Sequence, residues 1–419
     1  MVRAPIFTAG GKADGPCSGS TVYSRGEYHF VGSYMVNECA LSSYGTNSAF
    51  LHASGPTPLG PFTFRDQILP PFHHGAQVGR MPDGSFYIVG DGENTPAWTW
   101  QTNCQNGNQV IKAALPQKGR RELRRKVPKS GLYAFGNSPQ DFHIAAVSTS
   151  MYGPWTVYPN IMHTDLKPVS GWSCNVTNLS PLVLRNGTII MSFRSRSCVP
   201  DSVQAATCGN LCQFIGLAVS QNGWAGPFIR QAHPIAALQG NEDPFFWQDD
   251  RGYHILMHGK VVCGGAGVGT CGSLGYSQDL VTWYLSPDPV YGATISLTSG
   301  ADVTLNMRHR PKILFNSDMV PLVLYNGALV NGQSYIRNVA VAFNTAAMRN
   351  YQPPAPCPPK PQFKTLCGAN EKGVPRNQAQ CVALGTMNCI WCAATKLCMY
   401  GSDVRICTAE YPDNFYDYC

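Results

Sequence analysis

Charged residues are scarce in this chain, making up only 13% of its 419 residues. It also has no stretch of about 18 consecutive apolar residues, so the sequence predicts no segment that spans a membrane. Helical periodicity is nearly absent, which argues against a coiled coil or a helix bundle. Because 44% of the residues are apolar and 11% are aromatic, the chain has enough core-forming residues to exclude a disordered protein.

Several catalytic motifs are missing as well. The sequence has no glycine-rich phosphate loop, no His-Glu-x-x-His and no Gly-x-Ser-x-Gly. Phosphoryl transfer, zincin proteolysis and serine-hydrolase catalysis therefore lack support. The motifs predict neither a cofactor nor a metal ion.

The net charge of +7 comes mostly from one segment. Between Lys118 and Lys129, seven lysines and arginines stand against the single acid Glu122. Since the rest of the chain is about neutral, the composition does not predict a nucleic-acid partner. We interpret the basic segment as an exposed loop, a processing site or a contact for anionic glycans.

Seventeen cysteines are unevenly distributed, with nine before residue 357 and eight in the last 63 residues. This number favours an oxidising compartment, and the density near the C-terminus predicts a disulfide-bonded module. Three Asn-x-Ser/Thr sequons, at Asn175, Asn178 and Asn186, fit a glycoprotein. The apolar stretch near Met1 is too short for a signal peptide. We expect a secreted or extracellular protein, with the signal peptide not present in this chain.

Five segments share one pattern, in which two runs of alternating apolar residues flank a turn containing Gly or Asp. This pattern is typical of a β-hairpin. A second sequence motif, Ser followed a few residues later by Gly-Pro and an aromatic residue, comes after most of these segments. It predicts another pair of strands. Two hairpins per repeat make a four-stranded blade, so the sequence predicts an all-β fold, a five-bladed β-propeller. The five hairpin segments are 23–32, 75–89, 180–193, 243–257 and 310–325.

The composition divides the chain into three parts. Residues 1–348 hold the repeats and form the predicted propeller. Residues 349–362 are rich in proline, which predicts a stiff linker. Residues 363–419 form the predicted cysteine-rich module, where one Cys-x-x-Cys and no histidine favour disulfides over zinc.

The five hairpins resemble the five-bladed propellers of glycoside hydrolase family 43 and its relatives. The resemblance covers roughly residues 14–345 and includes Asn241-Glu-Asp-Pro-Phe-Phe-Trp247 in the fourth repeat. It implies a carbohydrate substrate, hydrolysed in a pocket on the propeller axis where the innermost strands begin. The C-terminal Cys389-Ile-Trp-Cys392 and its neighbouring cysteines resemble a plexin-semaphorin-integrin (PSI) module, a small disulfide-bonded spacer of cell-surface proteins.

The family resemblance also suggests catalytic positions. It implies a general-base Asp in blade one, a supporting Asp in blade three and a general-acid Glu in blade four. Glu242 matches the acid, and strand alternation predicts that the neighbouring Asp243, also a catalytic candidate, points to the opposite side. Counting back from the turn glycines places Cys17 and Ser180 at the other two positions, so two of the three acids are missing.

Other polar residues lie at the ends of the predicted inner strands and are candidates for binding the substrate. Each has a structural alternative, because a lone His or Arg is often a satisfied packing group. They are His73, His74, Asp91, Arg194, His258, His309 and Arg310.

We therefore predict a secreted glycosidase that acts on a poly- or oligosaccharide, with Glu242 as the proton donor. The alternative is a non-catalytic glycan-binding or adhesion propeller, which the missing acids at Cys17 and Ser180 favour. Two carboxyl groups brought together at the axis favour hydrolysis, and a lone glutamate favours binding.

Overall fold

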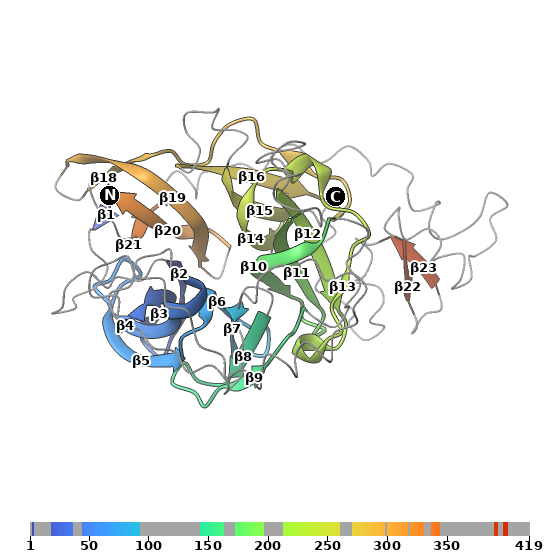
Figure 1. Ribbon diagram of the computed structural model, residues 1–419, viewed down its shortest axis with the longest axis horizontal. Coiled ribbons are helices and arrows are strands. Elements are labelled where there is room, and N and C mark those ends of the chain that lie inside the picture. The colour runs from blue at the N-terminus through green and yellow to red at the C-terminus, as the bar shows by residue number, and fades with distance from the viewer. Residues whose placement is uncertain are drawn as a thin grey trace, which may run out of the picture.

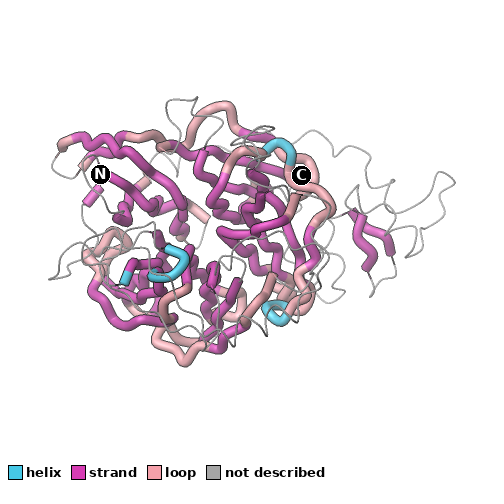
Figure 2. Tube along the Cα trace, in the orientation of Figure 1, coloured by secondary structure: helices cyan, strands magenta, loops and turns pink. Residues whose placement is uncertain are grey.

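The computed structural model of the chain is an all-β structure, drawn as a ribbon in Figure 1 and as a tube in Figure 2. The structure describes residues 2–3, 18–36, 44–92, 143–162, 172–196, 213–259, 270–297, 300–316, 319–330, 337–343, 389–392 and 397–400. Its helical segments are short: α1 (Tyr44–Asn47), η5 (Gly223–Ala225) and η6 (Ala236–Leu238). Among the described residues, no helix is long and apolar enough to cross a membrane.

Four antiparallel sheets of four strands follow one another along the chain as blades one to four. Blade one comprises β2 (Ser18–Ser24), β3 (Glu27–Met35), β4 (Ser48–Gly55) and β5 (Thr63–Leu69). Blade two comprises β6 (His73–Arg80), β7 (Phe86–Gly92), β8 (His143–Ser148) and β9 (Thr156–Tyr158). Blade three comprises β10 (Cys174–Val183), β11 (Ile189–Arg196), β12 (Gln213–Ser220) and β13 (Ile229–Arg230). Blade four comprises β14 (Glu242–Asp249), β15 (Gly252–Gly259), β16 (Cys271–Ser277) and β17 (Tyr284–Leu285).

Blade five is a five-stranded sheet that draws on both ends of the propeller sequence. Its strands from the C-terminal side are β18 (Thr294–Ser296), β19 (Asp302–Phe315), β20 (Pro321–Val330) and β21 (Arg337–Ala342). The N-terminal strand β1 (Val2–Arg3) pairs antiparallel with β21, with Val2 opposite Val341. The first residues of the chain thus complete the last blade.

The innermost strands, which are the first strands of blades one to four and β19 of blade five, lie around a common axis. Contacts join β2 to β6, β6 to β10, β10 to β14, β14 to β19 and β19 back to β2. These inner strands and their partners coincide with the five hairpins read from the sequence. The predicted five-bladed β-propeller is therefore confirmed, and the arrangement of blades around the axis can be followed in Figure 1.

The apolar core lies between neighbouring blades rather than at one centre. Phe50 and Ile88 pack between blades one and two, and Phe246 and Ile255 lie in the cluster between blades three and four. Trp172 is buried, and its ring stacks on that of Phe193 with the ring centres 5.9 Å apart. Alternating apolar residues of each strand thus form both faces of a blade, which a ring of packed sheets requires.

The repeated motif of Ser followed by Gly-Pro forms the turn between the third and fourth strands of blades one to three. The peptides before Pro61, Pro154 and Pro227 are cis. In blades two and three the serine hydroxyl closes the turn, since Ser148 accepts from the Ser150 amide and Ser220 accepts from the Asn222 amide. The predicted turns are confirmed at these positions.

Four of the five inner strands contain a β-bulge. The residues at the bulges have a positive φ: Gly75 (74°), Asn178 (57°), Asp243 (56°) and Arg310 (54°). The strand pairing shifts register at each of these positions. A bulge adds a residue and re-aims its neighbours, so side chains near these four points do not simply alternate between the faces of the strand.

The bulge in blade three corrects the position inferred for Ser180. Thr177 pairs with Arg194 as Glu242 pairs with His258, and the bulge residue follows in each case. Thr177 and Asn178, not Ser180, therefore stand at the level of Glu242 and Asp243. Counting from the turn glycine was wrong because a bulge inserts a residue that the sequence pattern does not reveal.

Ser180 instead links two blades. Its side chain is fully buried, and its hydroxyl accepts a hydrogen bond of 2.9 Å from the backbone amide of Phe246 on β14. Ser20 makes the corresponding bond to the Val78 amide, 2.7 Å long, between blades one and two. Both hydroxyls satisfy a backbone donor that the adjacent sheet leaves without a strand partner.

We expect Ser180→Ala to lower the free energy of unfolding by about 1–3 kcal/mol, because it leaves the buried Phe246 amide without an acceptor. Urea unfolding measures this change. Ser296→Ala is the control, since that hydroxyl donates to Asp302 at an exposed position and its loss should change stability by less than about 0.5 kcal/mol. Equal stability of Ser180→Ala and the wild type would contradict the linking role.

Part of the sequence interpretation lies outside the described residues, including Cys17, the basic segment Lys118–Lys129 and most of 349–419. Within the C-terminal part, β22 (Cys389–Cys392) pairs antiparallel with β23 (Leu397–Tyr400). The disulfide-rich PSI-like module and the domain boundaries stay predictions.

Candidate functional site

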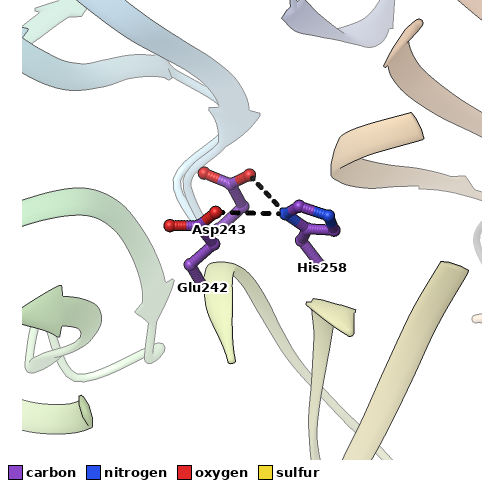
Figure 3. Close-up of side chains that lie close together, drawn as sticks. All are labelled: Glu242, Asp243 and His258. Atoms are coloured by element: carbon purple, nitrogen blue, oxygen red, sulfur yellow. Dashed lines mark ion pairs between the residues drawn. The ribbon is translucent and has the colours of Figure 1, made fainter. Parts of the chain in front are cut away.

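The axial ends of the inner strands bring charged side chains from blades two to five together. Glu242 and Asp243 begin β14, and His258 stands opposite Glu242 near the end of β15. The Nδ1 atom of His258 lies 3.2 Å from Glu242 Oε1 and 3.8 Å from Asp243 Oδ2, as Figure 3 shows. The prediction that Glu242 and Asp243 point to opposite sides was wrong. The positive φ of Asp243 at the bulge directs both carboxylates toward one imidazole.

Asp243 is buried and ties blade four to blade five. Its Oδ2 accepts a hydrogen bond of 3.2 Å from the Arg310 backbone amide and lies 3.7 Å from Nδ1 of His309. Burial by itself would raise the pKa of Asp243. The hydrogen bond to His309 and the charge of Arg310 outweigh burial and hold that pKa well below its usual range. Asp243 is therefore ionised at any physiological pH.

Glu242 is the carboxylate of this group that reaches solvent. Its side chain is 20% exposed, whereas those of Asp243 and Asp91 are each 7% exposed. One oxygen lies 3.6 Å from Nη2 of Arg194, whose Nη1 donates to Thr177 Oγ1. The Arg194 charge, together with His258 when it is protonated, stabilises the ionised form of Glu242.

Asp91, near the end of β7, has the opposite electrostatic balance to Asp243. Its oxygens lie 3.2 and 3.4 Å from the donating backbone amide of Asn178, and Oδ1 lies 3.9 Å from Nε2 of His143. Burial raises the pKa of Asp91 to about 7, because the Arg310 charge and the Asn178 hydrogen bond offset only part of the desolvation cost. Asp91 therefore keeps a proton close to neutral pH.

The histidines at the axis are held in fixed orientations. His74 Nδ1 lies 2.7 Å from the Ser48 hydroxyl, and its ring packs on Tyr44 at 5.0 Å. Burial lowers the pKa of His74 and of His309, so both are neutral near pH 7. The rings of His258 and His309 lie 6.1 Å apart.

His73 differs from the other predicted site residues. Its Nδ1 lies 2.7 Å from the Pro70 carbonyl oxygen, and its ring packs edge-on against Phe50 at 5.7 Å. These contacts anchor the start of β6. Among the described residues, no contact joins His73 to Glu242 or Asp243, so its binding role stays a prediction.

Lys312 on β19 is a site residue that the sequence reasoning missed. Its ammonium donates to the Pro244 carbonyl oxygen at 3.2 Å and lies 5.6 Å from the Phe245 ring centre. Burial lowers the pKa of Lys312 to about 7. The sequence signal that could have identified Lys312 is a lysine within the alternating apolar strand 310–315. Thr177, Asn178 and His143 were missed because they become axial only through the bulge and the blade-two strand pairing.

A metal ion does not fit this group well. Glu242, Asp243 and His258 each offer one ligand atom, and these atoms lie within 4.8 Å of one another. The same carboxylates, however, already have cationic neighbours: Arg194 beside Glu242, and Arg310 and Lys312 near Asp243. Since nearby positive charges oppose a divalent cation, we assign no chemical step to a metal.

Comparison of the sequence with protein-family models and with curated proteins finds no match. Among solved structures, the chain is similar to Zg3597, a family 117 glycoside hydrolase from Zobellia galactanivorans, with a TM-score of 0.48 and 10% identity over 78% of this chain and 83% of that one. A thermostable family 43 glycoside hydrolase has a TM-score of 0.46 and 10% identity, with 80% and 92% covered. The endo-arabinase of Bacteroides thetaiotaomicron has a TM-score of 0.45 and 10% identity, over 79% of this chain and 95% of that one.

These similarities are too distant to define an activity. The five-bladed fold follows from the sheet pairing and the ring of inner strands, and the function has to be inferred from the residues at the axis.

We expect Asp91→Asn to change how stability depends on pH. Between about pH 4 and 7 the folded protein retains a proton on Asp91 that the unfolded chain releases, so the free energy of unfolding falls as pH rises through this range. The amide cannot ionise and still accepts from Asn178. Relative to the wild type, the variant should therefore gain about 3–4 kcal/mol at pH 8 compared with pH 4.

Urea unfolding at pH 4 and pH 8 measures this difference. Asp83→Asn is the matched control, because hydrogen bonds from Ser85 lower the pKa of Asp83 at an exposed turn, and its substitution should bring no gain at pH 8. A parallel pH dependence of Asp91→Asn and the wild type would show that Asp91 ionises normally in the folded protein.

Proposed function

We propose that the protein is a carbohydrate-active, glycosidase-like propeller whose axial site hydrolyses glycosidic bonds. The observation that carries this proposal is the position of Glu242, the solvent-reaching member of three carboxyl groups gathered at the axial ends of β7 and β14. A glycosidic bond is cleaved by one carboxyl group that gives a proton and another that activates water or attacks the sugar. The site supplies carboxyl groups of both protonation states.

The environments of the carboxyl groups suggest how the roles divide. Asp91, whose pKa is raised to about 7, holds a proton near neutral pH, whereas Arg194 stabilises Glu242 as a carboxylate. Acid–base sites typically combine a carboxyl group that keeps its proton with a second carboxyl group beside a cation. We therefore assign Glu242 the carboxylate role and Asp91 the proton, in place of the general-acid role predicted for Glu242. Asp243 positions the group without reacting.

A non-catalytic glycan-binding propeller is the second candidate. It is favoured by blade three, which presents Thr177 and Asn178 at the axis where the family resemblance implies an acid. Asn178 also lies in a sequon, and its backbone amide contacts Asp91, so a glycan attached there would crowd the site. Secretion, glycosylation and the PSI-like spacer, proposed from the cysteines and sequons, are compatible with either candidate.

We expect Glu242→Gln to lower turnover at least about 100-fold, because the amide neither activates water nor attacks a sugar. Sugar release from a panel of aryl glycosides, oligosaccharides and polysaccharides provides the measurement. Glu27→Gln is the control, a carboxylate-to-amide change on blade one beside Arg65, and should stay within about twofold of the wild type. Equal turnover of Glu242→Gln and the wild type would remove Glu242 from the mechanism, and binding on a glycan array without cleavage would favour the second candidate.

A further inference from the structure

Two buried histidines of blade one are hydrogen-bonded to each other. His29 lies on β3 and His52 on β4, and they are 2% and 0% exposed. Nδ1 of His29 lies 2.9 Å from Nε2 of His52, and the two rings stack with their centres 5.2 Å apart. Because imidazoles change charge in the mildly acidic range, a direct bond between two of them is sensitive to pH.

The other contacts of this histidine pair fix where its protons lie. Nε2 of His29 lies 3.3 Å from the Ser24 carbonyl oxygen, which only accepts, so this nitrogen carries a proton. In neutral His29 the other nitrogen, Nδ1, is then the acceptor, and Nε2 of His52 donates to it. Nδ1 of His52 lies 3.5 Å from Oδ2 of Asp66, so a first additional proton is favoured on His52, where it faces a carboxylate.

A second additional proton does not fit the pair. It has to go on Nδ1 of His29, where it faces the N–H of His52 across the same 2.9 Å. Two donors then meet without an acceptor, and two positive charges lie side by side in a buried place. The closed pair therefore accommodates one extra proton, whereas two separated imidazoles in water take up two.

The charged groups that face the pair do not remove this limit. They are Glu27 on β3 and Arg65 and Asp66 on β5. Burial lowers the pKa of both histidines, and the charge of Arg65 lowers it further. The charges of the two acids raise it, but leave it below the ordinary histidine value of 6.5. As pH falls below that value, the open form gains stability because it binds more protons than the closed form.

The pair holds a turn of blade two against blade one. Tyr152, in the turn between β8 and β9, packs edge-on against both imidazoles, with its ring centre 5.5 Å from that of His29 and 5.3 Å from that of His52. Its hydroxyl lies 3.5 Å from Oε2 of Glu27. The adjacent Met151 is buried in the apolar cluster between the two blades. Separation of the imidazoles therefore removes the surface on which this turn packs.

We propose that His29 and His52 form an acid-sensitive contact between blades one and two, which separates when the second imidazole is protonated and releases the turn that carries Tyr152. The strands of both blades stay paired, so the change is a local opening rather than unfolding. It involves none of the axial acids and occurs whether or not the axial site hydrolyses sugars.

The equivalent turn of blade three packs on a phenol ring and a thioether instead. It contains the same motif of Ser followed by Gly-Pro, with a cis peptide before Pro227. Trp224 takes the place of Tyr152: its ring centre lies 5.3 Å from that of Tyr87, and its Nε1 donates to Sδ of Met81 at 3.3 Å. Burial raises the pKa of Tyr87 to about 12, so the phenol stays neutral in acid. This turn is therefore an internal control for the turn of blade two.

Hydrogen–deuterium exchange of the full chain tests the contact. It is followed by mass spectrometry at about pH 7.5 and about pH 5, and corrected for the intrinsic effect of pH on exchange. Each turn contains a bonded amide that reports opening, from Gly153 to the Ser150 carbonyl and from Gly226 to the Gly223 carbonyl. Residues 149–155 should exchange at least about tenfold faster at the lower pH. Residues 221–227 should change by less than about twofold.

Substitution of one imidazole tests the pair itself. In His29→Gln the amide oxygen accepts from His52 and the amide nitrogen donates to the Ser24 carbonyl, but the side chain takes up no proton near pH 5. The acceleration of residues 149–155 should then fall to less than about threefold. His233→Gln, the same change on an exposed segment, is the control and should keep the wild-type response.

The outcomes decide the role of the pair. Equal acceleration of both turns in the wild type, or none in residues 149–155, would overturn the proposal. A full response in His29→Gln would show that the turn opens for another reason. Should this variant fail to fold, His52→Gln removes the other imidazole and should flatten the response in the same way. If neither variant folds, the difference between the two turns of the wild-type protein decides the question.

Discussion

The ionised carboxylate of Asp243 is the constraint on which the centre of this propeller depends. A buried carboxylate is costly unless hydrogen bonds and opposite charges surround it. Here the Arg310 amide, His309 and Arg310 itself provide both. The same contacts join the bulge of blade four to the bulge of blade five, and they place Glu242 at the solvent-reaching edge of the group.

Two aspartates of the same site respond to burial in opposite ways. Asp243 is surrounded by donors and cations and stays ionised, whereas Asp91 is bonded mainly to one backbone amide and keeps its proton up to about pH 7. The difference comes from the number of compensating groups rather than from depth, since both side chains are 7% exposed. As a result, the axis of the propeller holds one ionised and one protonated acid in the same range of physiological pH.

Much of the fold could be predicted because hairpins leave local signals. Alternating apolar residues and turns containing Gly or Asp identified all five inner hairpins, and most of the polar residues at their ends do meet at the axis. The finer geometry could not be predicted, since a bulge depends on strand pairing. The bulges place the carboxylate of Asp243 on the same side as that of Glu242 and bring Asn178 to the site. They also place Ser180 between blades three and four. Lys312 was missed because an alternating pattern marks its position as core.

Pairing of β1 with β21 affects the order in which the protein can assemble during synthesis. Val2 cannot pair with Val341 until Val341 has been synthesised. This pairing closes a loop that includes almost the whole propeller, and closing it costs chain entropy. Ribosomes deliver that partner strand after the other blades have emerged. Until then the ring of blades is open, and the edge of the last sheet is exposed. We therefore expect chaperones to bind the nascent chain at the pairing of β1 with β21.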